Sequence, residues 1–285
     1  EIRRTAIYEH AVADLLGLTR EGGVEEGRGA DLLPMMREIG LSLFAGEAGK
    51  KPIARRHLLD LIEGCKRKPM LRGLTAEQSV KLGEREKATY LLKELEEKRF
   101  LTLWGPDEFL VPHRSVLEYL AGSGLAEKLT GLTNDKAWWK WVEAKAWDPD
   151  WKEVIVFSAG SLVGRWGELK GLLARLSDKK KDDHFRHRLA VAAECLGEIP
   201  KDNRTAIDQE IDKITTEAFE LWCERCRDGA AEIYPIRKSL SALAVCNGRI
   251  EGVPLLDRIP VLLADQAGYV RDSAVKAVGE MGAAA

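Results

Sequence analysis

The sequence has no long hydrophobic run, no surplus of cysteine and no excess of charge of one sign. Its longest apolar stretch, residues 154–164, includes two glycines and two serines and is too short to cross a bilayer. The five cysteines are odd in number and follow no disulfide framework, which is typical of reduced thiols in a cytoplasmic protein. With 44 Lys and Arg against 46 Asp and Glu, a chain-wide nucleic-acid footprint is excluded, although a local basic patch is not.

Signatures of enzyme chemistry are also missing. Gly49-Lys50 resembles the end of a phosphate-binding loop, but Phe44 stands where the first glycine belongs, and Lys51 replaces the Ser or Thr that holds magnesium. The five histidines are scattered, and no G-x-S-x-G motif occurs. We therefore predict no catalytic residue and no enzyme activity within this chain.

Two residue pairs have the spacing of half a zinc site each. They are Cys223-x-x-Cys226 and His184-x-x-His187, and both lie within helical patterns. No further ligand pair has matching spacing, so the sequence favours a chain without a metal site over one that uses these four residues.

Residues 1–130 are predicted to form a winged-helix and helical region. Apolar residues recur at helical spacing, as in Ile7, Ala11, Leu15 and Leu18. The expected helices fall at residues 7–18, 32–44, 58–62, 75–98 and 115–129. Residues 100–104 and 108–111 alternate around a short turn and predict a β-hairpin. Helices followed by one small hairpin are typical of a winged helix.

Residues 131–285 are predicted to be helical throughout and to contain an internal repeat. Residues 183–199 align with residues 265–281 after a shift of 82, and a middle copy at residues 236–244 precedes the last copy by 34 residues. A mean period near 40 residues, with two helices per unit, is the range of HEAT and armadillo repeats. The fold class expected for the whole chain is therefore mostly α, with an α-solenoid of HEAT-like repeats following the winged-helix region.

Five of the eight tryptophans lie between residues 138 and 151. A platform for stacking nucleic-acid bases would need aromatic residues interleaved with cations. Acidic residues balance the lysines in this stretch, so core packing is favoured because tryptophan contributes a large buried area.

Residues 50–72 form a basic stretch with eight basic and two acidic residues. In a winged helix such a stretch could contact DNA phosphates. Residues 1–130 as a whole, however, contain 21 basic and 21 acidic residues. A solvated face is therefore favoured over a DNA interface.

The segment of residues 109–121, FLVPHRSVLEYLA, resembles the F-x-H-x-S-F-Q-E-Y-L-A-A signature that follows the nucleotide-binding core of NACHT-type STAND ATPases, which are relatives of NOD-like receptors. Residues 4–9, RTAIYE, look like the R-x-x-L-Y-E entry into the same region. Residues 151–160 are similar to a W-x-E-V-I-x-L-x-A-G segment that leads into helical repeats. The sequence departs from the signature at Pro112, where a non-proline apolar residue is usual, and at Leu117, which replaces Gln.

The resemblance implies a latch and a sensor. In such proteins the winged-helix histidine contacts the β-phosphate of ADP and holds the inactive state, and His113 is the matching residue. Glu118 and Tyr119 match a conserved family pair that we interpret as helix packing. The implied partners are the chain's own upstream nucleotide-binding domain, which would bind ADP or ATP with Mg, a protein trigger on the repeats, and further copies upon oligomerisation.

The lack of an initiator Met and of a closing cap at residues 282–285 favours a piece of a longer protein. The resemblance suggests bacterial anti-phage defence as the setting. Two alternatives stay open at this point: a stand-alone HEAT-type scaffold that binds proteins, and a DNA-binding winged-helix protein.

Overall fold

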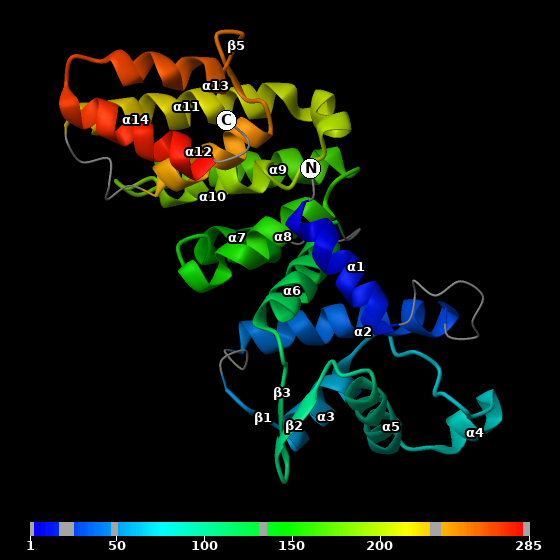
Figure 1. The fold of residues 1–285 in the computed structure, drawn as a ribbon. Coiled ribbons are helices and arrows are strands. Elements are labelled where there is room, and N and C mark those ends of the chain that lie inside the picture. Colours follow the sequence, from blue (N-terminus) through cyan, green and yellow to red (C-terminus); the bar gives the residue numbers. More distant parts are fainter. Residues whose placement is uncertain (1–2, 17–25, 47–50, 131–135, 229–234, 282–285) are drawn as a thin grey trace. The chain divides into compact units, whose positions relative to one another are not determined.

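A computed structural model describes residues 3–16, 26–46, 51–130, 136–228 and 235–281. The chain is mostly helical with small antiparallel sheets, as the sequence predicts (Figure 1). It divides into an N-terminal unit, Ile2–Leu125, and a C-terminal unit, Ala126–Ala285. Within the described ranges, none of the helices has the length and apolarity that crossing a membrane requires.

The N-terminal unit combines helices with a three-stranded sheet (Figure 1). Its helices are α1 (Arg4–Leu16), α2 (Glu26–Ala45), α3 (Arg55–Gly64), α4 (Ala76–Lys81), α5 (Glu84–Glu97) and the start of α6 (Arg114–Leu129). The strands are β1 (Ile53–Ala54), β2 (Thr102–Gly105) and β3 (Glu108–Leu110), paired antiparallel in the order β1-β3-β2.

The sheet contains the expected hairpin and one strand more. β2 and β3 form the hairpin that residues 100–111 predict. The additional strand is β1, in which Ile53 pairs with Phe109 while both side chains are buried. Two residues are too short to show an alternating pattern, so this strand exists only because β3 lies beside it.

The helix expected over residues 75–98 is interrupted. Thr75 caps α4 in a reciprocal hydrogen-bonded pair with Gln78, and α4 ends before Leu82. The Gly83 amide then donates to the Glu86 carboxylate at 2.9 Å and begins α5. Glycine is a poor helix former, and Glu86 satisfies an amide that a continuous helix would have paired internally.

Helix α6 packs against α2 through glycine. A Cβ atom added at Gly124 would lie 2.5 Å from the Arg37 carbonyl oxygen and 3.3 Å from the Leu41 Cβ. At Gly40 an added Cβ would lie 2.9 Å from the Leu120 Cβ. Both positions therefore need glycine so that the two helix backbones can approach each other.

We expect Gly124→Ala to lower the free energy of unfolding by about 1–3 kcal/mol, because the new methyl group overpacks against rigid backbone. The matched control is Gly64→Ala at the end of α3, where an added Cβ meets nothing within 4 Å. Urea denaturation monitored by circular dichroism compares the two variants. Equal stabilities would contradict the close approach of α2 and α6.

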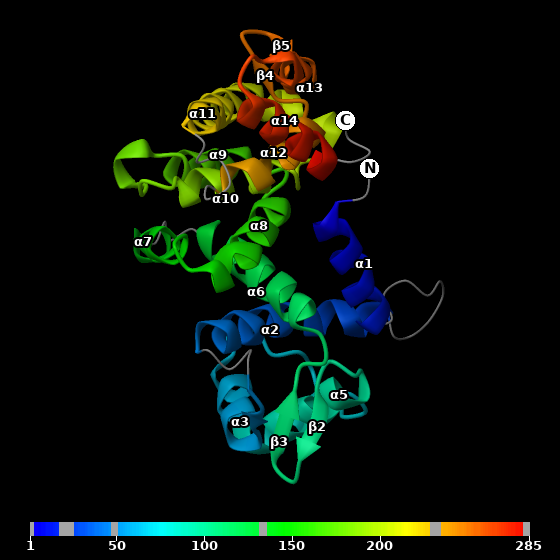
Figure 2. The ribbon, with the colours of Figure 1, turned by 60° about the vertical axis from the view of Figure 1, so that its left-hand side comes forward.

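The C-terminal unit holds the remaining helices (Figure 2). The α-helices are α7 (Lys136–Lys145), α8 (Lys152–Ser161), α9 (Trp166–Leu176), α10 (His187–Leu196), α11 (Asp208–Arg227), α12 (Ile236–Val245), α13 (Leu255–Arg258) and α14 (Gly268–Met281). Among the described residues, 3-10 turns lie between them at Pro149–Trp151, Lys179–Lys181, Lys201–Ile207 and Ile259–Ala264.

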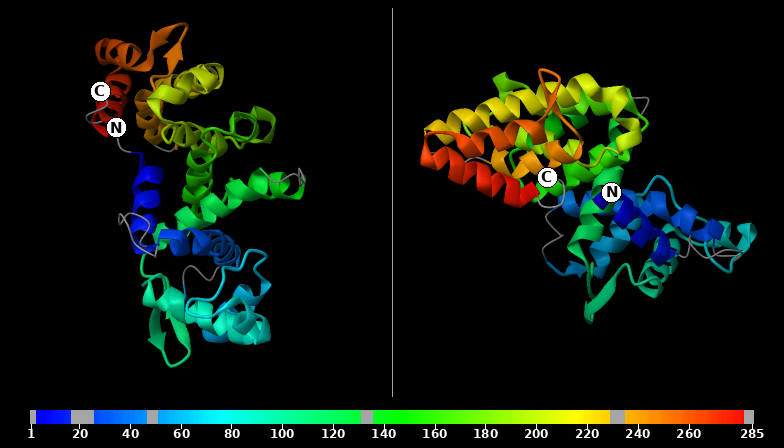
Figure 3. Two further views of the ribbon diagram at one scale, coloured as in Figure 1. Left: turned by 90° about the vertical axis from the view of Figure 1, so that its right-hand side faces the viewer. Right: turned by 45° about the horizontal axis from the view of Figure 1, so that its top comes forward.

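Most of these helices lie in two rows. Helices α8, α10, α12 and α14 pack one after another and form the first row (Figures 2 and 3). Helices α9 and α11 contact each other and form the second row, which packs against the first. Helices α10, α12 and α14 carry the three sequence copies, and the equivalent residues Ala192, Leu240 and Ala274 are fully buried, with alanine in the first and last copies. Small side chains there allow close stacking between successive helices.

A short hairpin corrects the expectation that this half is helical throughout. β4 (Arg249–Ile250) pairs with β5 (Val253–Pro254) across Glu251 and Gly252. Both turn residues have positive φ, 52° and 80°, the conformation of a two-residue type I′ hairpin turn. Helical periodicity cannot register a hairpin this short.

Gly248, just before β4, lies directly against α11. A Cβ added there would overlap the Thr215 hydroxyl and lie 2.9 Å from the Thr215 Cβ, which is fully buried. We expect Gly248→Ala to lower the free energy of unfolding by about 2–3 kcal/mol. Gly167→Ala in α9, where an added Cβ meets nothing within 4 Å, is the control for thermal and urea unfolding. A Gly248→Ala protein as stable as the control would show that α11 and this turn are not packed as described.

Candidate functional site

His113 lies at the junction between the sheet and α6. The chain leaves β3 at Leu110, passes through Val111 and Pro112, and enters α6 at Arg114. The His113 carbonyl accepts hydrogen bonds from Val116 N at 3.1 Å and Leu117 N at 3.3 Å, so its backbone belongs to the first turn of α6. Its imidazole is exposed. A backbone fixed at a helix start and a free side chain suit a group that reaches a ligand or partner.

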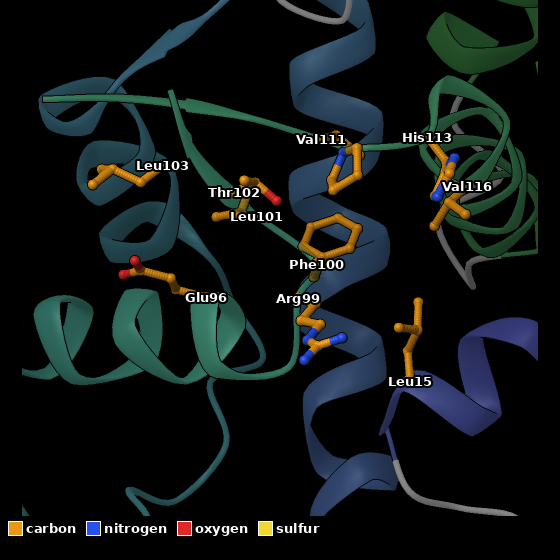
Figure 4. Close-up of a pocket in the computed structure, with 11 residues that line it drawn as sticks. Leu15, Glu96, Arg99, Phe100, Leu101, Thr102, Leu103, Val111, His113 and Val116 are labelled. Carbon is orange, nitrogen blue, oxygen red and sulfur yellow. The ribbon is translucent and has the colours of Figure 1, made fainter. Parts of the chain in front are cut away.

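A pocket of about 610 Å³ opens beside His113 (Figure 4). It lies within the N-terminal unit, between the end of α1, the end of α5, strand β2 and the segment that joins β3 to α6. Its lining is Leu15, Glu96, Arg99, Phe100, Leu101, Thr102, Leu103, Val111, Pro112, His113 and Val116. The size is typical of small-molecule sites.

The end of α5 brings Arg99 to this pocket. The Phe100 amide donates to the Leu95 carbonyl and the Arg99 amide to the Glu96 carbonyl, which is a Schellman ending. Arg99 occupies its left-handed position, with φ of 58°. Glycine usually fills this position, and a bulkier residue there carries a conformational cost. Sequence reasoning missed Arg99 and the pocket, since a basic residue after a helix is an ordinary ending signal.

Two segments of the family resemblance meet in the fold. Tyr8 of the 4–9 segment stacks on Tyr119 of the 109–121 segment, with ring centroids 6.4 Å apart. Burial raises the pKa of the Tyr119 hydroxyl. Glu118 is buried and accepts a hydrogen bond from Arg114 Nε at 2.8 Å. Tyr119 thus packs α6 against α1, and Glu118 pairs with Arg114 within α6, which agrees with the interpretation of this pair as helix packing.

Within the basic stretch, Lys68 forms an ion pair with Glu84 of α5. Lys68 and Lys87 lie 2.6 and 2.8 Å from Glu84, and their hydrogen bonds lower the pKa of this carboxyl to about 2. Arg85 pairs with Asp60 at 2.7 Å, which joins α5 to α3. Lys50 lies outside the described residues. These pairs engage one basic residue, Lys68, and one acidic residue, Asp60, of the stretch, so the solvated face stays a prediction.

The tryptophan cluster lies in the C-terminal unit and contributes to packing. Trp139 and Trp151 are buried, and Trp141 meets Trp151 edge-on with ring centroids 4.3 Å apart. The Arg175 guanidinium lies 4.5 Å from the centre of the Trp139 ring. Trp147 is more exposed and lies beneath Arg188 at 5.8 Å. These contacts support core packing over a base-stacking platform.

The structure does not bring the two candidate zinc half-sites together. Cys223 and Cys226 lie on α11, where burial raises the pKa of the Cys223 thiol to about 12. His187 begins α10, and its Nδ1 lies 2.7 Å from an Asp183 carboxylate oxygen. Across the described ranges, no group of three or more His, Cys, Asp or Glu side chains is arranged to hold a metal ion.

The chain matches no protein-family model, no curated protein and no solved structure in the comparisons made.

We expect His113→Ala to change the free energy of unfolding by less than about 0.5 kcal/mol, because an exposed side chain contributes little to folding. Phe109→Ala, four residues earlier and fully buried in the sheet, should cost about 3–5 kcal/mol. Thermal unfolding of both variants measures the contrast. A large loss on replacing His113 would make it a structural residue and remove it from the candidate site.

Proposed function

We propose that this chain is the latch and sensor portion of a NACHT-type STAND ATPase. The observation that carries the proposal is the position of His113. It lies exposed at the start of α6, within the 109–121 segment, whose Tyr119 packs against Tyr8 of the other family-like segment. A setting in bacterial anti-phage defence is part of the proposal.

The topology of the N-terminal unit supports a winged helix. A winged helix has three antiparallel strands, with the strand that follows the first helix pairing with the last one. The order β1-β3-β2 follows this pattern, with β1 between α2 and α3 and the β2–β3 hairpin as the wing. In this assignment α2, α3 and α5 are its helices.

The packing of the C-terminal unit supports a HEAT-like array. Helices α10, α12 and α14 carry similar sequences, pack in succession and share α11 as a neighbour. Arrays of this kind bury a continuous core between units and leave extended faces for partners. We assign the binding of a protein trigger to these faces, with oligomerisation of the intact protein as its outcome.

The mechanism we propose is a population shift. When ADP is held by an upstream nucleotide-binding domain, which also binds ATP and Mg, the exposed imidazole of His113 is the group that can donate a hydrogen bond to phosphate. That contact would favour the closed state, and a trigger that binds the open state better would release it. No residue of this chain is assigned a chemical step.

A DNA-binding winged helix is the less favoured alternative. Helix α5 occupies the place of the helix that enters the major groove in such proteins. Its exposed residues include Glu86, Glu96 and Glu97 beside Arg85 and Lys93, so this helix lacks the excess of positive charge that binding to DNA phosphates needs. A stand-alone HEAT-type scaffold that binds proteins without any nucleotide switch is the other alternative.

The test is the retention of ADP by the full product of the reading frame. We expect the wild-type protein to purify with bound ADP and His113→Ala to bind ADP about tenfold more weakly, because one charge-assisted hydrogen bond is lost. His57→Ala on α3, which is also exposed, is the matched control. Nucleotide is measured by chromatography after denaturation.

ADP retention that is equal in the His113 and His57 variants would remove the latch role from His113. A full-length protein that binds no nucleotide at all would favour the stand-alone scaffold.

A further inference from the structure

We propose that the pocket beside His113 binds a small amphipathic anion, with a medium-chain aliphatic carboxylate as the ligand class. This inference goes beyond the nucleotide switch and does not depend on it. The volume of about 610 Å³ exceeds what a lone inorganic anion needs and lies within the range of sites for small organic molecules.

The walls of the pocket are apolar. Phe100 and Val116 are buried side chains that line it, and Leu15 and Val111 are half-buried. In Figure 4, Phe100, Val111, Val116 and Leu15 gather around one side of the space. An alkyl chain placed there is removed from water, which is favourable in proportion to its buried area.

Two basic side chains beside these apolar walls favour a ligand with a negative charge. Arg99 and His113 are exposed and lie on either side of the apolar walls (Figure 4). Among the described contacts, neither side chain forms an ion pair. A guanidinium offers paired donors that match a carboxylate, and an imidazole adds another. The one acidic lining residue, Glu96, lies toward the opposite side, near Leu103 (Figure 4).

The backbone at Arg99 is a second reason to assign it a role. Its left-handed conformation at the end of α5 would suit glycine better. A side chain kept where glycine is preferred is consistent with a task for its guanidinium. The conformation also provides a useful variant, since Arg99→Gly removes the charge while it relieves the backbone.

Taken together with the proposed latch, and only with it, the pocket has a regulatory consequence. A carboxylate bound at this pocket engages the same imidazole that we assign to a phosphate, so the two contacts compete. A saturating anionic ligand would then weaken ADP retention by the intact protein.

The experiment is an NMR titration of the full chain, labelled at its leucine and valine methyl groups, with octanoate as the probe. Octanol and octylamine are titrated in parallel because they share the chain length but differ in head-group charge. We expect saturable shifts of the Leu15, Leu103, Val111 and Val116 methyl signals with octanoate. Leu173, buried in α9 of the C-terminal unit, should not move.

Octanol should bind at least about tenfold more weakly than octanoate, since it makes no charge-assisted hydrogen bond. Octylamine should bind more weakly still. Pocket signals that do not shift at millimolar octanoate overturn the site. Octanol or octylamine binding as tightly as octanoate overturns the recognition of an anion.

Arg99→Gly separates recognition from folding. We expect its unfolding midpoint to rise while its affinity for octanoate falls about tenfold and its affinity for octanol stays unchanged. Arg56→Gln, an exposed arginine of α3 outside the pocket, should bind octanoate as the wild type does. Wild-type affinity in Arg99→Gly overturns the role of the guanidinium. Because these readouts involve no nucleotide, failure here leaves the ADP test of the latch unaffected.

Discussion

The close approach of α2 and α6 is the constraint on which the N-terminal unit depends. Where Gly124 faces the Arg37 carbonyl, no side chain fits between the two backbones. This contact and the one between Gly40 and Leu120 fix the line along which α6 runs. Since α6 begins immediately after His113, these contacts also fix the position of the His113 backbone, from which the imidazole extends. The candidate site is thus positioned by Gly124, which lies eleven residues beyond His113 along α6, and by Gly40 on α2.

Sequence patterns predicted the elements whose signal is local. The helices around residues 32–44 and 115–129 have regular apolar spacing, and the hairpin at residues 100–111 alternates around a turn, so each is recognisable alone. β1 and the β4–β5 hairpin have two-residue strands, which carry no period. They form because Phe109 accepts Ile53 as a partner and because Glu251 and Gly252 adopt positive φ. Neither cause can be seen in a hydrophobic pattern.

The candidate site could likewise be predicted only in part from the sequence. His113 was found because it belongs to a contiguous segment that resembles a family signature. The pocket beside it was not found, because Leu15, Arg99 and Val116 come from three distant segments that only the folded chain brings together. Spacing alone can also suggest a site that the fold does not form, as with Cys223-x-x-Cys226 and His184-x-x-His187. Both pairs have the spacing of zinc ligands, but the cysteines lie on α11, and His187, at the start of α10, contacts Asp183.

The size of a single contact limits what His113 can do in the proposed latch. One charge-assisted hydrogen bond contributes about 1.5–3 kcal/mol, which changes a ratio of two states by about 10- to 150-fold. Moving a switch from almost closed to almost open needs roughly 10⁴-fold. In the proposed switch the remainder would have to come from other contacts that differ between the states, and the proposal assigns these to the C-terminal helices. In the proposed mechanism, a latch built on His113 would set the threshold of the switch, and a trigger bound to the C-terminal helices would supply most of the free energy that opens it.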